Sequence, residues 1–206
     1  GLEKYKVGNY QGAIADWNKA IEINPQDALA YYNRGLAKYD LGDHQGAIVD
    51  YDKAIEINPQ QSLAYLNRGV AKYDLNDFQG AITDYDKLIK INPRNGDAYS
   101  NRGSAKMELK DYQGAISDTN QALEINPKNS NAYYNRGVSK TNLQDYQGAI
   151  ADYTKAIEIN PQFANAYNNR GITRELVNDL DGACNDWREA AGFGLTEPAE
   201  WVKKQC

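Results

Sequence analysis

An asparagine–proline pair recurs along the chain at a constant spacing of 34 residues. The prolines of these pairs are Pro25, Pro59, Pro93, Pro127 and Pro161. A fixed period of this length is typical of a repeat array, in which one small unit is copied and the copies stack. The period therefore indicates one array over the 206 residues rather than a single closed core.

Other columns keep the same period and define the repeat boundaries. Glycine recurs at Gly35, Gly69, Gly103, Gly137 and Gly171, and alanine at Ala47, Ala81, Ala115, Ala149 and Ala183. We predict a partial repeat at 1–27, full repeats at 28–61, 62–95, 96–129 and 130–163, a divergent repeat at 164–192 and a capping helix at 195–206. Gly1 aligns with the middle of a first helix, so we expect the natural chain to continue upstream.

Each copy is predicted to form two helices. In residues 28–61, apolar and small residues recur at three- and four-residue spacing before and after Gly42. Gly42 is expected to stop the first helix, and Asp43 to cap the second. Asn58-Pro59 ends the second helix, because proline removes a backbone donor and restricts the residue before it. Such a helix pair cannot bury its own apolar face, so the copies must stack.

The order and spacing of one set of residues resemble the tetratricopeptide repeat (TPR) signature. In the first full copy these residues are Tyr31, Gly35, Tyr39, Ala47, Tyr51, Ala54 and Pro59. The particular residues of the copies, as in Tyr134-Asn135-Arg136-Gly137, are similar to those of TPR arrays common in bacteria, especially cyanobacteria. The resemblance implies an all-α, right-handed superhelical solenoid of helix-turn-helix units, in which the first helices line a concave groove.

The C-terminal end departs from the period, since Gly192-Phe193-Gly194 replaces the asparagine–proline pair. We expect Thr196 to cap a last amphipathic helix that covers the end of the array. Two readings stay open for Cys184 and Cys206: a disulfide bond or two buried thiols. A disulfide would favour a periplasmic or other oxidising compartment, whereas its absence leaves the cytoplasm slightly favoured.

Composition excludes several functional classes. No apolar run approaches the length that crosses a bilayer, and a net charge of −5 argues against nucleic-acid binding. No phosphate-binding glycine loop or nucleophile–histidine arrangement is present, so we expect neither an enzyme nor a cofactor. His44 is the only histidine and is expected to pack at a turn rather than bind a metal.

Three charged columns recur with the same period. Arginine occupies a core-facing position at Arg34, Arg68, Arg102, Arg136 and Arg170, and aspartate follows each by 16 residues at Asp50, Asp84, Asp118, Asp152 and Asp186. Because a charge at such a position needs a partner, we predict a repeated ion pair between helices. A lysine column, Lys38, Lys72, Lys106 and Lys140, is expected to form a solvated, ion-paired stripe.

An asparagine column occupies the middle of every first helix, where asparagine is a mediocre helix former. It could bind the backbone of a partner, as the TPR resemblance implies, or bond neighbouring helices across the stack; both readings stay open. The candidate partner-binding residues are Asn33, Asn67, Asn101, Asn135, Asn169, Tyr32, Tyr39, Asp40, Leu66, Tyr73, Asp74, Met107, Glu108 and Tyr134.

The predicted groove lining combines tyrosine, aliphatic and acidic residues, and contains no lysine. TPR domains that bind acidic chaperone tails use a basic clamp, and Leu29 and Tyr32 occupy its positions in this chain. We therefore expect a protein or peptide partner with apolar anchors and some positive charge, and no chaperone tail. The resulting hypothesis is an interaction scaffold that serves as an assembly or adaptor factor. The alternatives are a docking or self-association module of a longer enzyme or signalling protein, and a self-assembling array.

Overall fold

The computed structural model describes residues 1–206, apart from the side chains of residues 203–205. The described chain forms α-helices and no β-strand. The helices are α1 (Leu2–Lys6), α2 (Tyr10–Ile23), α3 (Ala28–Asp40), α4 (His44–Ile57), α5 (Ser62–Asp74), α6 (Phe78–Ile91), α7 (Gly96–Glu108), α8 (Tyr112–Ile125), α9 (Ser130–Asn142), α10 (Tyr146–Ile159), α11 (Ala164–Leu176), α12 (Leu180–Gly192) and α13 (Thr196–Gln205).

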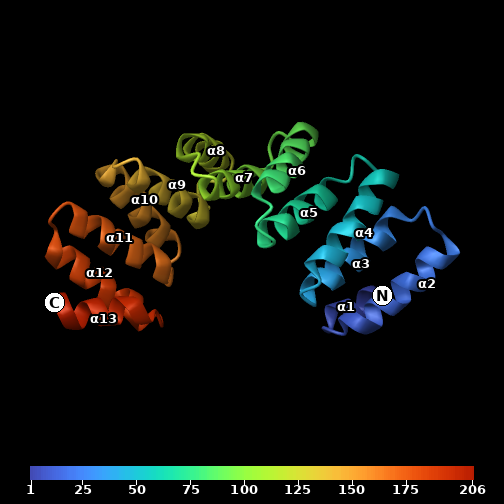
Figure 1. Cartoon of the computed structure of the whole chain (residues 1–206), viewed down its shortest axis with the longest axis horizontal. Coiled ribbons are helices and arrows are strands. Elements are labelled where there is room, and N and C mark those ends of the chain that lie inside the picture. The colour runs from blue at the N-terminus through green and yellow to red at the C-terminus, as the bar shows by residue number, and fades with distance from the viewer. The chain divides into compact units, whose positions relative to one another are not determined.

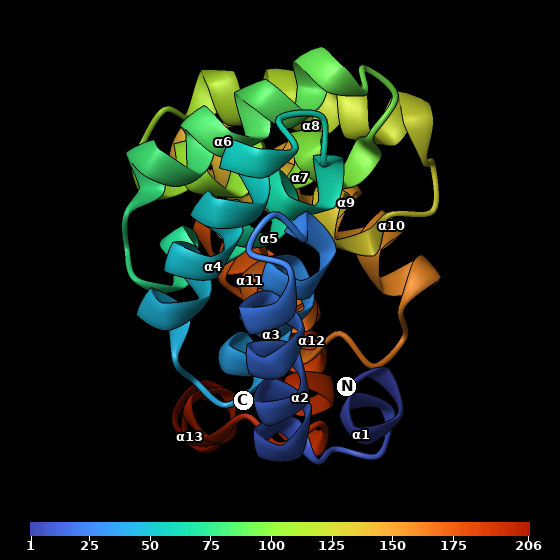
Figure 2. The same ribbon diagram turned by 90° about the vertical axis from the view of Figure 1, so that its right-hand side faces the viewer.

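The chain divides into two compact units, Gly1–Ala105 and Lys106–Cys206. Within the first unit, drawn blue to green, each helix from α1 to α6 packs against the next (Figure 1). Within the second unit, the same holds from α8 to α13 (Figure 2). First helices of successive repeats also touch, α3 with α5 in one unit and α9 with α11 in the other. Side chains of successive first helices therefore share one surface in each unit.

The helix ends follow the expected chemistry. Asp43 is the N-cap of α4, and its carboxylate accepts the backbone N–H of Gly46. Gly42 has a φ of 82°, the left-handed conformation that ends a helix. Both predictions are therefore confirmed. The equivalent turn positions adopt the same conformation without glycine, at Asn76, Lys110, Gln144 and Asn178.

The core lies where small residues let two helices approach closely. Ala47 is fully buried, and a Cβ added at Gly35 would lie only 2.7 Å from the Tyr51 ring. The same contact recurs between Gly69 and Tyr85 and between Gly137 and Tyr153. Trp17 and Trp187, which occupy the column of Tyr51, are buried as well.

The predicted ion pairs of Arg34, Arg68, Arg136 and Arg170 are present, and the contacts extend further than the sequence indicated. Arg34 donates two hydrogen bonds to Asp50, which is fully buried, and Lys38 lies 2.8 Å from the same carboxylate. The Arg34 Nη1 group also donates to Asn18 of the preceding repeat, at 2.7 Å. Equivalent arginine contacts to the preceding repeat are made by Arg68 to Asp52, Arg102 to Asp86, Arg136 to Asn120 and Arg170 to Thr154.

The lysine column is ion-paired, as expected, but it is not a solvated stripe. Lys38, Lys72 and Lys140 each reach a buried aspartate that an arginine also holds. Their side chains are only 20–23% exposed, because the aspartates draw them toward the interface between the two helices of a repeat.

The C-terminal helix α13 packs on α12. The indole rings of Trp187 and Trp201 meet edge to face at 5.2 Å, and Cys184 and Cys206 form a disulfide with a Cα–Cα distance of 5.8 Å. The prediction that Thr196 caps this helix is wrong. The helix already begins at Thr196, and Leu195 occupies the cap position without a side-chain hydrogen bond.

Candidate partner-binding face

Three hollows of the same construction lie between successive first helices. The Tyr51 hollow is lined by Leu36, Tyr39, Asp40, Tyr51, Asn67 and Val70. The Tyr85 hollow is lined by Val70, Tyr73, Tyr85, Asn101 and Ser104. The Tyr153 hollow, in the second unit, is lined by Val138, Thr141, Asn142, Tyr153, Asn169, Ile172 and Thr173. Each has a cavity volume of about 150–160 Å³.

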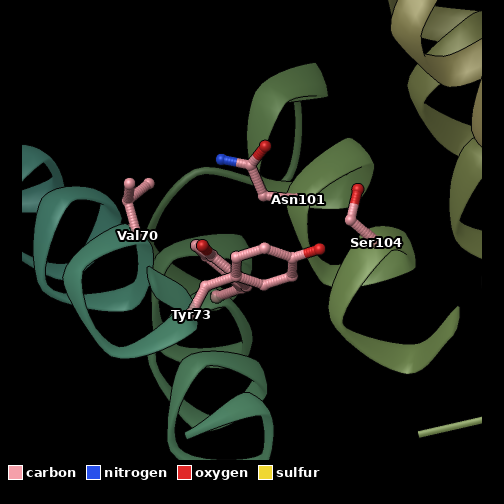
Figure 3. A pocket seen from close by; sticks show the side chains of 5 residues that line it. Val70, Tyr73, Asn101 and Ser104 are labelled. Carbon is pink, nitrogen blue, oxygen red and sulfur yellow. The ribbon is translucent and has the colours of Figure 1, made fainter. Parts of the chain in front are cut away.

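The repeat itself generates these hollows. Their floors are tyrosines of the second helices, whose rings lie against the glycines at 35, 69 and 137. Their walls come from two successive first helices. In the Tyr85 hollow, Val70 and Tyr73 project from α5, whereas Asn101 and Ser104 project from α7 (Figure 3). Val70 lines both hollows of the first unit, so the two adjoin on one face.

The asparagine column bonds across the stack at two positions. The Asn67 amide donates to the Tyr32 hydroxyl at 2.9 Å, and the Asn169 amide donates to the Tyr134 hydroxyl at 3.0 Å. Each bond joins two successive first helices, so at these two positions asparagine bonds neighbouring helices across the stack. Asn135 is buried, while Asn33 and Asn101 are half-buried.

The acidic residues of the face are held by tyrosines of the preceding repeat. The Tyr5 hydroxyl donates to Asp40 at 2.5 Å, and the Tyr39 hydroxyl donates to Asp74 at 2.5 Å. Partial burial and the Asp74 carboxylate raise the pKa of Tyr39 to about 12, because both disfavour the phenolate. The tyrosines therefore stay neutral donors at physiological pH and fix the two carboxylates in place.

The second unit differs in the chemistry of its hollow. Asn142 and Thr141 occupy the columns of Asp40 and Tyr39. The Thr141 hydroxyl lies 3.2 Å from both the Tyr153 and the Thr173 hydroxyls. The polar groups of the Tyr153 hollow thus bond to one another, and its lining has no carboxylate.

Some predicted residues lie beneath or beside the face. Tyr32 is 8% exposed and packs against Tyr51, so it belongs to the core rather than the lining. Leu66 packs against buried core residues, and Tyr134 is half-buried against Phe163. On α7, Met107 is half-buried and Glu108 is exposed.

The floor tyrosines Tyr51, Tyr85 and Tyr153 were not among the predicted partner-binding residues. A signal was available, since a large ring and a glycine recur in matched columns. No group of side chains suited to a metal ion occurs among the described residues. None of the helices searched in the described chain is long and apolar enough to cross a membrane.

Family comparison decides the identity of the repeat. A TPR repeat model matches residues 1–42 and 71–109. One tetratricopeptide repeat model matches residues 28–61, 96–129 and 130–163, and a second matches residues 152–185. The chain belongs to the tetratricopeptide repeat family. The TPR models together cover residues 1–61 and 71–185, in agreement with the all-helical structure.

Solved TPR structures resemble most or all of the array. A structure of MamA is 28% identical, with a TM-score of 0.70 over 82% of this chain and 96% of that one. A crystal structure of YrrB, described as a TPR protein with an unusual peptide-binding site, is 24% identical, with a TM-score of 0.72 over 91% of this chain and 97% of that one. PilF of Pseudomonas aeruginosa reaches a TM-score of 0.83 at 18% identity, over 99% and 94%. Curated protein sequences gave no significant match.

These comparisons support the general class of function. TPR arrays are typically non-catalytic protein-interaction folds, and the family and its structural relatives support a protein–protein interaction scaffold.

Proposed function

We propose that the chain binds an extended segment of a partner protein along the face lined by the Tyr51 and Tyr85 hollows, as an assembly or adaptor scaffold. The observation that carries the proposal is the regular succession of these hollows, which share Val70. An extended peptide places side chains at regular intervals, so a periodic row of hollows can receive successive anchors.

The lining suggests the character of the partner. Leu36, Val70 and the tyrosine rings offer apolar contact, and tyrosine does so at low cost in side-chain entropy. Asp40 adds negative charge, and the described lining of these two hollows contains no lysine or arginine. A segment with apolar anchors and some positive charge fits this surface better than an acidic chaperone tail. The peptide-binding site attributed to YrrB is consistent with this use of the fold.

A matched pair of substitutions tests the proposal. Val70→Arg would fill both hollows of the first unit, whereas Val49→Arg introduces the same charge at an exposed position outside them. Peptides selected from a displayed library against the native chain would be titrated onto each variant by fluorescence anisotropy. We expect Val70→Arg to weaken binding at least tenfold and Val49→Arg to leave it unchanged. Equal affinity for both variants would place the binding surface elsewhere on the molecule.

A further inference from the structure

The floor of the Tyr51 hollow carries a polar group without a protein partner. Tyr51 is 0% exposed, and its hydroxyl oxygen is buried without a hydrogen bond. Burying an unpaired hydroxyl costs free energy, so a native structure that retains one needs a reason. Burial also raises the pKa of Tyr51, which keeps the group a neutral phenol.

The equivalent group of the second unit is satisfied internally. Tyr153 has the Thr141 hydroxyl 3.2 Å away, but the column of Thr141 contains Tyr39 in the Tyr51 hollow. Tyr39 directs its hydroxyl to Asp74 instead. The two hollows therefore differ in the pairing of the floor hydroxyl: Tyr153 has a hydrogen-bond partner, whereas Tyr51 has none.

Two polar side chains that line the hollow together with Tyr51 offer acceptors. Asp40 contributes a carboxylate, of which one oxygen accepts the Tyr5 hydroxyl. Asn67 donates its amide N–H to Tyr32, which leaves its carbonyl oxygen to the hollow as a further acceptor. Phenol oxygens in this chain do accept N–H donors, as Tyr32 and Tyr134 show.

The cations of the surrounding helices are already used. Arg34 and Lys38 of α3 bind Asp50, and Arg68 and Lys72 of α5 bind Asp84. Lys53 of α4 pairs with Glu56. The negative charge of Asp40 at this hollow is thus not neutralised by any lysine or arginine of α3, α4 or α5.

We propose that the Tyr51 hollow is a subsite for a basic side chain of the bound segment. An ammonium or guanidinium group brings several N–H donors and no acceptor, which matches the Tyr51 hydroxyl oxygen, the Asn67 carbonyl and the Asp40 carboxylate. The Tyr153 hollow, with Asn142 in the Asp40 column, has no such preference. This inference rests on the proposed function and specifies the chemistry of the partner side chain that enters the Tyr51 hollow.

Small probes test the subsite without an identified partner. Nα-acetyl-lysine methylamide and Nα-acetyl-arginine methylamide would be titrated onto the intact chain carrying labelled tyrosine rings and asparagine amides. Their neutral counterparts, the Nε-acetylated lysine and the citrulline compounds, serve as controls. We expect saturable NMR shifts at Tyr51 and Asn67 with at least one basic probe and none with its neutral counterpart, and no saturable shift at Tyr153.

Three variants separate the contributions. Asp40→Asn should weaken the basic probe about tenfold, the size expected for a charged hydrogen bond. Asp97→Asn makes the same charge change at an exposed site outside the hollows and should have no effect. Tyr51→Phe retains the ring that packs on Gly35, so the fold survives while the probe response at Asn67 weakens. Equal shifts with basic and neutral probes, or no saturable shift, would overturn the subsite and leave a hollow that holds only water.

The two proposals can fail separately. If library peptides bind in a Val70-dependent manner but tolerate replacement of every lysine and arginine by glutamine, the face is the binding site and the basic subsite is wrong. If the basic probes bind at Tyr51 but peptide affinity is the same in Val70→Arg and Val49→Arg, the subsite stands and the proposed function fails.

Discussion

The second helices α4, α6 and α10 each contain an aspartate that is nearly inaccessible to solvent, and the cost of that burial is met by two cations of the neighbouring first helix. Asp50 accepts two N–H groups from Arg34 and an ion pair from Lys38. The guanidinium of Arg34 also lies 5.3 Å from the centre of the Tyr31 ring, so its planar face is covered as well. At this scale the charges are paired in full, and removal of one partner leaves the other without compensation.

We expect Arg34→Leu to lower the free energy of unfolding by about 3 kcal/mol, because it strands the buried Asp50 carboxylate with Lys38 alone. Urea unfolding followed by circular dichroism measures the change. The triple variant Arg34→Leu/Lys38→Leu/Asp50→Leu removes all three charges of the cluster and should lie within about 1 kcal/mol of the native chain. A single variant as stable as the native chain would show that the pair is dispensable.

The charged pairs could be predicted from the sequence, because Arg34 and Asp50 fall in matched columns and neither can be buried alone. The state of the Tyr51 hydroxyl could not. Whether this hydroxyl finds a partner depends on the residue 12 positions earlier in the same repeat, which is threonine for Tyr153 and tyrosine for Tyr51. The exact direction in which Tyr39 turns its hydroxyl is a property of three-dimensional packing rather than of spacing.

The pairing of helices depends on one ring and one missing side chain. The Tyr51 ring of α4 lies on Gly35 of α3, and the same arrangement floors each hollow. A side chain at the glycine would push the two helices of a repeat apart and deform the hollow above them.

Gly35→Ala is therefore expected to destabilise the chain by about 1–3 kcal/mol, despite the better helix propensity of alanine. Gly192→Ala is the matched control, since an added Cβ at Gly192 meets nothing within 4 Å. We expect no loss of stability there. Thermal unfolding of the two variants side by side gives the comparison, and equal midpoints would contradict the packing argument.

Helix ends show both the reach and the limit of sequence reasoning at this scale. Asp43 and Gly42 were predictable, because capping and left-handed turns prefer those residue types. The predicted cap at Thr196 was wrong by one residue, because the N-cap of α13 is Leu195, which makes no side-chain hydrogen bond. This helix is held instead by its packing and disulfide contacts with α12. Lys110 and Gln144 adopt the left-handed conformation without the usual residue type, so the fixed repeat geometry overrides local preference.

For the molecule as a whole, contacts are local along the chain, and each of the two compact units has its own core clusters. A disulfide between Cys184 and Cys206 closes a 22-residue separation and ties the last residue of the chain to α12. In a repeat array such a cross-link stabilises its own neighbourhood, because each repeat contacts only adjacent ones.

Reduction of the disulfide is expected to cost the second unit about 3 kcal/mol of stability and to leave the first unit unchanged. Hydrogen exchange with and without dithiothreitol would show faster exchange in α12 and α13 and no change in α3 to α5. The variant Cys184→Ala/Cys206→Ser should behave like the reduced chain under both conditions. Two free thiols in the denatured, non-reduced protein would contradict the bond itself.

The arginine that reaches back to the preceding repeat has a consequence for how such a gene can change. A tandem duplication of the codons for residues 62–95 would insert a repeat whose own arginine meets Asp86 behind it and an aspartate equivalent to Asp84 within it. The next arginine along, Arg102, would find a copy of Asp86 in the same register. Recombination can therefore lengthen or shorten the array by whole repeats without passing through a product that buries an unpaired charge. The number of hollows can then change under selection while the arginine contacts between successive repeats are kept.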